Sequence, residues 1–161
     1  MVQIVQNSVF INRPLDDVFA FVTDPATTSQ WQTNLVRSEI LTPGPMRTGT
    51  RVLEVRRLGN SERQAEWEVT AYEPSLKREY VYPKGFGLIR QKGVTTFEPK
   101  NGGTLLRFTA WVEASFPLNL LLPLLVLFMR RQNDKSFALL KQLLESGNGL
   151  QARPIVGQES V

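Results

Sequence analysis

The side chains that can do chemistry in this chain are tyrosines, arginines and carboxylates, because its 161 residues include no histidine and no cysteine. Those two absences remove the commonest general base near neutral pH, the thiolate nucleophile and the usual ligands of transition metals. We therefore expect no metal site. The chemistry that remains is the orienting, polarising or protonating of a ligand by hydroxyl, carboxyl and guanidinium groups.

Tyr80 and Tyr82 are the clearest candidates for orienting a ligand. They stand two residues apart in "KREYVYP", so in a strand both side chains point to one face. A tyrosine offers an apolar ring and a hydroxyl that positions a ligand inside an otherwise apolar pocket. The competing interpretation is that both are half-buried strand residues whose hydroxyls reach water.

Arginines and carboxylates give weaker signals. Arg90 and Arg107 carry guanidinium groups that hold carboxylates or polarise carbonyls, although most arginines lie on the surface. Glu66 and Glu68 alternate with apolar residues and are better explained by a solvated strand face than by an acid–base pair. The glycine pair in "KGFGLI" has no surrounding βαβ unit, so we expect no dinucleotide and no other cofactor.

Composition and charge describe an ordinary globular domain with a mild positive charge. Hydrophobic residues make up 42% of the chain, the net charge is +4, and the basic doublets are isolated and close to acids. A nucleic-acid surface concentrates its charge on one face, so we expect no nucleic-acid partner. The length fits one domain, at residues 1–147, with a flexible tail at 148–161. No secretory signal is visible, and we expect a cytoplasmic location.

The N-terminal part of the sequence predicts one strand followed by two short helices. Residues 2–12 alternate as a strand, but the apolar parity changes near Asn7-Ser8, which predicts a bulge or bend there. In "RPLDDVFAFVTD" the proline suits a first helical turn and the apolar residues recur at helical spacing. Asp24-Pro25 then caps and begins a second short helix that leads to Trp31.

Between Leu35 and Glu113 the apolar period is two, which predicts strands joined by hairpins. Turn signals separate these strands at "TPGPMRTG", Gly59-Asn60, Glu73-Pro74 and "KNGG". We expect an α+β fold, in which a strongly curved antiparallel sheet of about seven strands wraps around a long C-terminal helix.

The stretch from Leu118 to Met129 is far more apolar than the rest of the chain, since eleven of its twelve residues are apolar or proline. A membrane-spanning helix needs about twenty such residues, so this stretch is too short to span a bilayer. Pro123 suits the first turn of a long helix that runs to Ser146 and ends at Gly147. Because the start of this helix is apolar on all sides, a bound lipid, a second subunit, the loop 42–49 or a membrane surface must cover it.

Four passages carry a resemblance to a known family. They are "INRPLDDVFAFVTDPATTSQWQ", the hairpin "AEWEVTAYEPSLKREY", the hairpin "FEPKNGGTLLRFTAWVE" and the helix end "SFALLKQLLES". In this order they resemble the START-like, birch-pollen-allergen-like (SRPBCC) superfamily, and within it the polyketide cyclase/dehydrase and lipid-transport group. The resemblance implies the helix-grip fold, with an apolar cavity between the bent sheet and the closing helix.

The resemblance implies a ligand as well as a fold. Its members bind lipids, sterols, polyketides or other apolar molecules, and a few catalyse cyclisation or dehydration. We expect these side chains to contact the ligand, although core packing alone also explains the tryptophans: Trp31, Trp67, Val69, Tyr80, Tyr82, Arg90, Phe108, Leu125, Phe128 and Met129.

Three functional hypotheses remain open. The first is a carrier or sensor that binds an apolar small molecule without covalent chemistry. The second is a cyclase or dehydratase that uses Tyr80, Tyr82, Arg90 or a buried carboxylate, and the lack of histidine weakens it. The third is a protein-interaction module. For Leu118–Met129 we expect a homodimer contact or a transient contact with a membrane surface.

Overall fold

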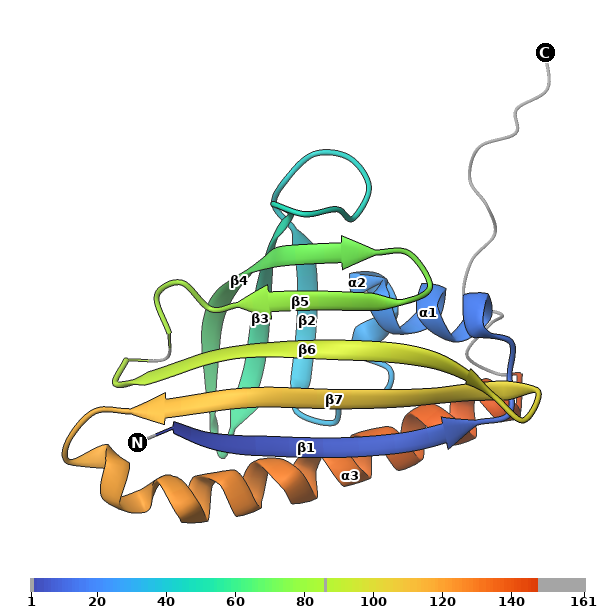
Figure 1. The fold of residues 1–161 in the computed structure, drawn as a ribbon. Helices are drawn as coiled ribbons and strands as arrows, with labels where there is room; N and C mark the ends of the chain where they lie inside the picture. The colour runs from blue at the N-terminus through green and yellow to red at the C-terminus, as the bar shows by residue number, and fades with distance from the viewer. Residues whose placement is uncertain (1, 86, 148–161) are drawn as a thin grey trace.

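The computed structural model describes residues 2–85 and 87–147. The predicted tail at 148–161 lies outside these residues. Figure 1 shows the strands, the helices and a 3-10 turn, η1, in this order: β1 (Val2–Ile11), α1 (Leu15–Thr23), α2 (Pro25–Thr28), β2 (Leu35–Ile40), β3 (Arg51–Leu58), β4 (Ser61–Glu73), β5 (Lys77–Val81), β6 (Ile89–Lys100), β7 (Gly103–Ala114), η1 (Leu118–Leu121) and α3 (Leu122–Glu145).

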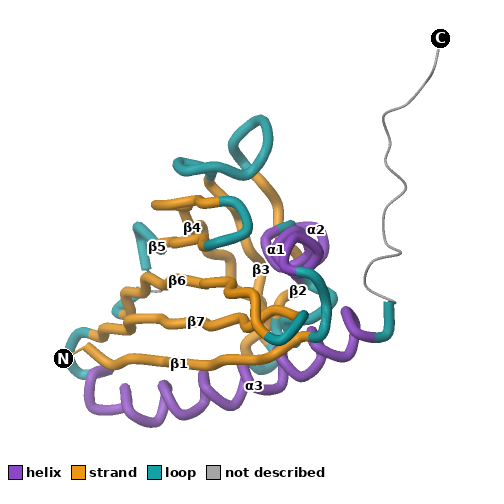
Figure 2. Tube along the Cα trace, turned by 45° about the vertical axis from the view of Figure 1, so that its right-hand side comes forward, coloured by secondary structure: helices purple, strands orange, loops and turns teal. Residues whose placement is uncertain are grey.

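The strands form one 7-stranded antiparallel sheet in the order β1-β7-β6-β5-β4-β3-β2. The register shifts between Leu35 and Arg37 in β2 and between Val69 and Ala71 in β4. Such irregularities increase the local twist and bend of a strand. Figures 1 and 2 show the resulting curved sheet with α3 running beside β1 and with α2 near β2. The predicted architecture is confirmed.

The bulge predicted at Asn7-Ser8 is wrong. β1 pairs with β7 in an unbroken register from Val2 opposite Glu113 to Ile11 opposite Thr104. The parity changes because the apolar residues Val2 and Ile4 lie on the outer face, where they are exposed. Asn7 takes one of the inward positions, so a polar residue stands where the pattern required an apolar one.

Asn7 connects β1 to the middle of α3. It is only 9% exposed, and its amide nitrogen donates to Asp134 Oδ1 at 2.7 Å and to the carbonyl of Arg130 at 3.2 Å. Asn133 Nδ2 in turn donates to Asn7 Oδ1 at 3.0 Å. Both donors and the acceptor of the buried amide are therefore used, which is the condition for burying such a group at low cost.

Three further contacts attach α3 along the same edge strand. Arg130 Nη2 donates to the Ile4 carbonyl at 2.8 Å, and Lys141 Nζ donates to the Phe10 carbonyl at 2.7 Å. Glu145 Oε1 accepts from the backbone N–H of Asn12 at 2.9 Å. An edge strand has unpaired backbone groups, and these contacts satisfy several of them. The helix therefore lies at the border of the sheet and contacts β1 more than any other strand.

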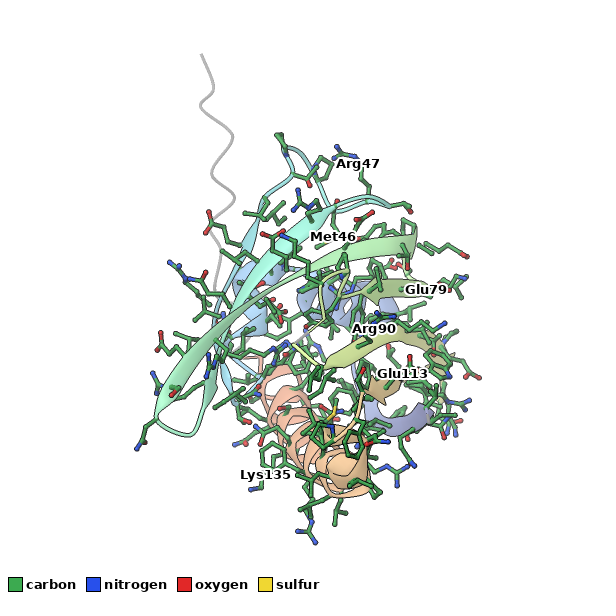
Figure 3. All side chains as sticks on the ribbon, turned by 90° about the vertical axis from the view of Figure 1, so that its left-hand side faces the viewer. Met46, Arg47, Glu79, Arg90, Glu113 and Lys135 are labelled. Carbon is green, nitrogen blue, oxygen red and sulfur yellow. The ribbon has the colours of Figure 1, made fainter. Side chains whose placement is uncertain are left out.

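The long helix begins and ends as predicted. Pro123 lies in its first turn, and Gly147 follows the last turn with φ of +76°, a conformation that favours glycine. In the second half of α3 the core residues Phe137, Leu140 and Leu144 are buried. Figure 3 shows Lys135, on the opposite side of the helix, projecting away from the sheet.

The hydrophobic core is divided into three clusters. One joins α1, Trp31 and the second half of α3 to Phe97 and Leu106. A second joins the first half of α3 to β1 and β7 through Leu122 and Val126. A third lies on β3 and β4 around Trp67. The clusters are connected, since Phe108 packs against the first and the second, and Tyr72 packs against the first and the third.

The apolar start of α3 is buried on one side only. Its outer side is exposed, with Leu120 at 72%, Leu124 at 67% and Leu127 at 45%. The loop 42–49 does not cover this side, because Figures 1 and 2 place that loop at the opposite end of the molecule. No described helix is both long and apolar enough to cross a membrane. We call the exposed surface the apolar patch: Phe116, Leu120, Leu121, Leu124, Leu127 and Phe128.

The attachment of α3 to β1 predicts a strong effect of the Asn7→Ala substitution. Removing the amide leaves the Arg130 carbonyl and the Asn133 side chain without their buried partner, so we expect the free energy of unfolding to fall by about 1–3 kcal/mol. Chemical denaturation monitored by circular dichroism measures this change. Ser8→Ala, at the adjacent and exposed position, is the matched control and should change stability little. Equal effects of the two substitutions would contradict the anchoring role of Asn7.

A ligand-sized cavity between the sheet and the long helix

A cavity of about 270 Å³ lies between the concave face of the sheet and α3. Its volume is near the lower end of the range for small-molecule sites, about 300–1,000 Å³. The sheet forms one wall and α3 the other, and residues after α2 close one end. Exposed rim residues, Leu58, Arg63 and Phe128, place the mouth between the β3–β4 hairpin and α3.

Most of the predicted ligand-contacting residues line this cavity. They come from five separate segments of the chain, and the fold brings them together: Trp31, Trp67, Tyr80, Tyr82, Phe108, Leu125, Phe128 and Met129. Their contact with a ligand remains a prediction. Val69 and Arg90 do not line the cavity.

The expected positions of Val69 and Arg90 in the cavity wall are therefore wrong, for different reasons. Val69 is fully buried, but it lies where β4 changes register, and it packs in the cluster that contains Val52 and Met46. Arg90 is exposed, because its even position on β6 points to the outer face. Figure 3 shows Arg90 near Glu113, which is its partner on β7.

Aromatic rings form much of the sheet wall. The Tyr80 ring meets Trp67 edge-on at 5.9 Å and Tyr82 at 5.7 Å, and it stacks on Phe108 at 6.4 Å between centroids. Gly93 stands opposite Tyr80 in the β5–β6 register, and a Cβ there would lie 2.7 Å from the tyrosine hydroxyl oxygen. The Tyr80 ring can therefore lie flat over β6 only because position 93 has no side chain.

One end of the cavity contains a buried ion pair. Glu54 is 3% exposed, and its Oε2 atom lies 2.7 Å from Arg56 Nη2 and accepts from the Tyr82 hydroxyl at 3.1 Å. Arg56 also donates to Asn34 Oδ1 at 2.8 Å and to Gln32 Oε1 at 2.7 Å. Burial works to lower the pKa of Arg56, but attraction to Glu54, the hydrogen bond to Glu54 and smaller contributions from Tyr82 and Tyr80 together raise that pKa above its ordinary value. Arg56 is thus ionised, and each of its three nitrogens has an acceptor.

The two cavity tyrosines are protonated at neutral pH. Burial raises the pKa of Tyr80 to about 12, against a smaller lowering by the hydrogen bond from Gln91, whose Nε2 donates to the Tyr80 hydroxyl at 2.9 Å. Burial also raises the pKa of Tyr82 well above its ordinary value, and the nearby Glu54 carboxylate adds to this. Both side chains are therefore hydrogen-bonding groups rather than bases.

Arg78 is the second buried guanidinium in the cavity wall. It is 8% exposed, it lies over the Trp67 ring at 5.2 Å from the centroid, and its Nη1 donates to the Thr23 carbonyl at 3.3 Å. Burial lowers its pKa, and attraction to Glu54 opposes that change.

The sequence analysis missed Glu54, Arg56 and Arg78, although strand parity could have found them. Arg78 stands two residues before Tyr80 and therefore shares its face, but it entered the sequence analysis only as part of an isolated basic doublet, Lys77-Arg78. Glu54 shares the inward face of β3 with Val52, which is completely buried. A charged residue type by itself gives no signal of burial, because such residues are rarely buried.

The site is thus an apolar cavity with a few polar side chains at one end, most of which have hydrogen-bond partners. This is the composition of a ligand-binding pocket. No group of three or more histidine, cysteine, aspartate or glutamate side chains that could hold a metal ion occurs among the residues that the structure describes. The fold and the cavity define a helix-grip protein. The chain belongs to the polyketide cyclase/dehydrase and lipid-transport family, whose model matches residues 2–145.

Solved structures support the same fold. The structure of TTHA0849 from Thermus thermophilus has a TM-score of 0.75 and 18% identity, covering 90% of this chain and 99% of that one. Ara h 8.0201 has a TM-score of 0.70 and 12% identity, covering 91% of this chain and 99% of that one. The di-domain ARO/CYC BexL from the BE-7585A biosynthetic pathway has a TM-score of 0.73 and 16% identity, covering 95% of this chain and 51% of that one. No curated protein matches the chain.

We expect substitutions of Glu54 and Glu66 to differ clearly in their effect on stability, because only Glu54 belongs to the buried ion pair. Glu54→Gln leaves Arg56 without its counter-charge, so we expect a loss of stability near the lower end of about 3–5 kcal/mol, since Arg56 keeps some contact with solvent. Glu66→Gln, which breaks the exposed pair with Arg51, is the control and should cost less than about 1 kcal/mol. Urea denaturation of both variants measures the difference. Losses of similar size would mean that Glu54 is not structurally coupled to Arg56.

Proposed function

We propose that this protein is a carrier or sensor that binds an apolar small molecule in the cavity without covalent chemistry. The observation that supports this most is the cavity itself, which is lined by residues of the sheet and of α3. Membership of a family described by lipid transport as well as cyclisation agrees with it. The proposed ligand contacts are the eight predicted residues that line the cavity.

The cavity volume limits the ligand. About 270 Å³ corresponds to the volume of roughly nine liquid water molecules. A medium-length acyl chain or a small aromatic compound is of this size, whereas a complete sterol would have to extend through the mouth. Among the ligand types expected from the sequence, the geometry therefore favours the smaller ones.

A fluorescent medium-chain fatty acid tests this function. We expect saturable binding with one site per chain, which Leu125→Trp should abolish because the larger side chain enters the cavity. Leu127→Trp, on the same helix but outside the cavity lining, is the control and should leave binding unchanged. The expected loss is at least about tenfold in affinity, from the several van der Waals contacts replaced. Unsaturable uptake, or uptake insensitive to Leu125→Trp, would contradict a cavity site.

A cyclase or dehydratase activity is the second candidate. The observation that favours it is the Glu54 carboxylate, buried in the cavity wall within 3.1 Å of the Tyr82 hydroxyl. Two solved neighbours are titled as di-domain ARO/CYC structures from biosynthetic pathways. Arg90 cannot take part, since it lies on the outer face. Turnover of a linear polyketide that is lost in Glu54→Gln while binding persists would establish the enzymatic function.

We propose in addition that the apolar patch contacts an anionic membrane surface. Residues 115–133 contain Arg130 and Arg131 and no carboxylate, so the charge beside the patch is positive. A groove along the patch shares Ile89, Leu125 and Phe128 with the cavity lining, so the patch continues into the mouth. Its four leucines are already partly covered, so burying their remaining exposed surface would contribute about 4–7 kcal/mol.

Vesicle binding distinguishes a membrane contact from a homodimer. We expect the protein to co-sediment with vesicles that contain anionic lipid, and expect Leu120→Gln/Leu124→Gln to lose this binding without loss of folding, because both side chains are exposed. Ala138→Gln, at an exposed position in the second half of α3, is the control. A stable dimer in sedimentation velocity that the double substitution dissociates would show that a second copy covers the patch instead.

A further inference from the structure

The charged side chains of the cavity do not balance. Within the described residues its lining contains three arginines and one carboxylate. Glu54 is paired with Arg56, and Arg63 is exposed at the rim, where water solvates it. Arg78 is the remaining cation: it is buried, and no ion pair to it is present among the residues described.

Arg78 also uses few of its hydrogen-bond donors. A guanidinium has five N–H donors, and the described residues accept only one of them, at the long distance of 3.3 Å to the Thr23 carbonyl. Its Nε donor is buried without a partner. The Trp67 ring beneath it provides a cation–π contact but no hydrogen bond. A buried cation in this state is costly unless an anion or several acceptors join it.

Two more lining residues have donors without acceptors. The indole nitrogens of Trp31 and Trp67 are buried, and neither N–H has a partner in the described part of the chain. The buried side-chain atoms of the lining that lack a partner within the described residues are therefore all donors, and the lining carries more positive than negative charge. A ligand group with negatively charged oxygen atoms would accept hydrogen bonds from these donors and would balance the positive charge.

We infer that the ligand of this cavity is an amphiphile with an oxyanion head group, such as a carboxylate, bound by Arg78. Arg78, Tyr80 and Tyr82 share one face of β5 and its continuation, so the head group would lie beside the two phenols. The apolar part would extend toward Phe108 and the helix residues Leu125 and Met129. This inference rests on the proposed binding function and specifies its ligand class.

Three probes with the same chain and different head groups test the inference. They are decanoate, decanol and decylamine, added to the purified full chain and followed by isothermal titration calorimetry. We expect decanoate to bind about 10- to 100-fold more tightly than decanol, because a charge-assisted hydrogen bond replaces a neutral one. Decylamine should bind most weakly, because its charge has the same sign as that of Arg78.

Substitution of Arg78 then tests whether this residue causes the preference for decanoate over decanol. Arg78→Met keeps the apolar bulk of the side chain and should lower decanoate affinity to that of decanol, while decanol binding stays unchanged and shows that the cavity is intact. Arg63→Gln, at the exposed rim, tests the competing position for the anion and should keep most of the preference for decanoate. Arg107→Gln, at an exposed position outside the cavity lining, is the matched control. If Arg78→Met does not fold, the comparison of the three probes on the wild-type protein still decides the head-group preference.

The outcomes separate this inference from the function on which it rests. Equal binding of decanoate and decanol, or a preference that survives Arg78→Met, would overturn the anionic head group while leaving an apolar ligand site in place. Failure of all three probes and of the fluorescent fatty acid to bind would overturn both. Loss of the preference in Arg63→Gln alone would move the anion site to the mouth and would also contradict the inference.

Discussion

The arrangement of this protein depends on where its long helix is attached. Asn7, Arg130 and Lys141 tie α3 to the edge strand β1, so the helix lies along the border of the sheet and not over its centre. Because the sheet curves, core side chains fill only part of the space between its concave face and α3. The remaining space is the cavity, and it follows from this attachment.

The charged side chains of the cavity wall have their partners only in part. Glu54, Arg56 and Tyr82 form a satisfied network, in which each charge has a partner. Among the described residues Arg78 has no ion-pair partner, and natural proteins commonly retain costly buried groups at functional sites. The apolar patch is costly in the same sense, since its leucines face solvent. The groove along the patch shares Ile89, Leu125 and Phe128 with the lining of the cavity that contains Arg78.

The sequence predicted the fold better than the site, for physical reasons. Alternation, turn residues and the Pro123 and Gly147 boundaries are local signals, so the succession of strands and helices along the chain could be predicted from them. The role of Asn7 depends on Asp134 and Asn133, more than a hundred positions away, and no local pattern reveals it. Tyr80 was recognised from its residue type, whereas Arg78 on the same face was not, because arginine is rarely buried.

The central claim is that the ligand occupies the hollow between the sheet and α3, and isotope-filtered nuclear Overhauser measurements with methyl-labelled protein test it most directly. With unlabelled decanoate bound, we predict contacts from the acyl chain to the methyl groups of Leu106, Leu125 and Met129, which line the cavity. Contacts confined to Leu120, Leu124 and Leu127, on the outer side of the helix, would show that the apolar patch binds the ligand and would contradict the account.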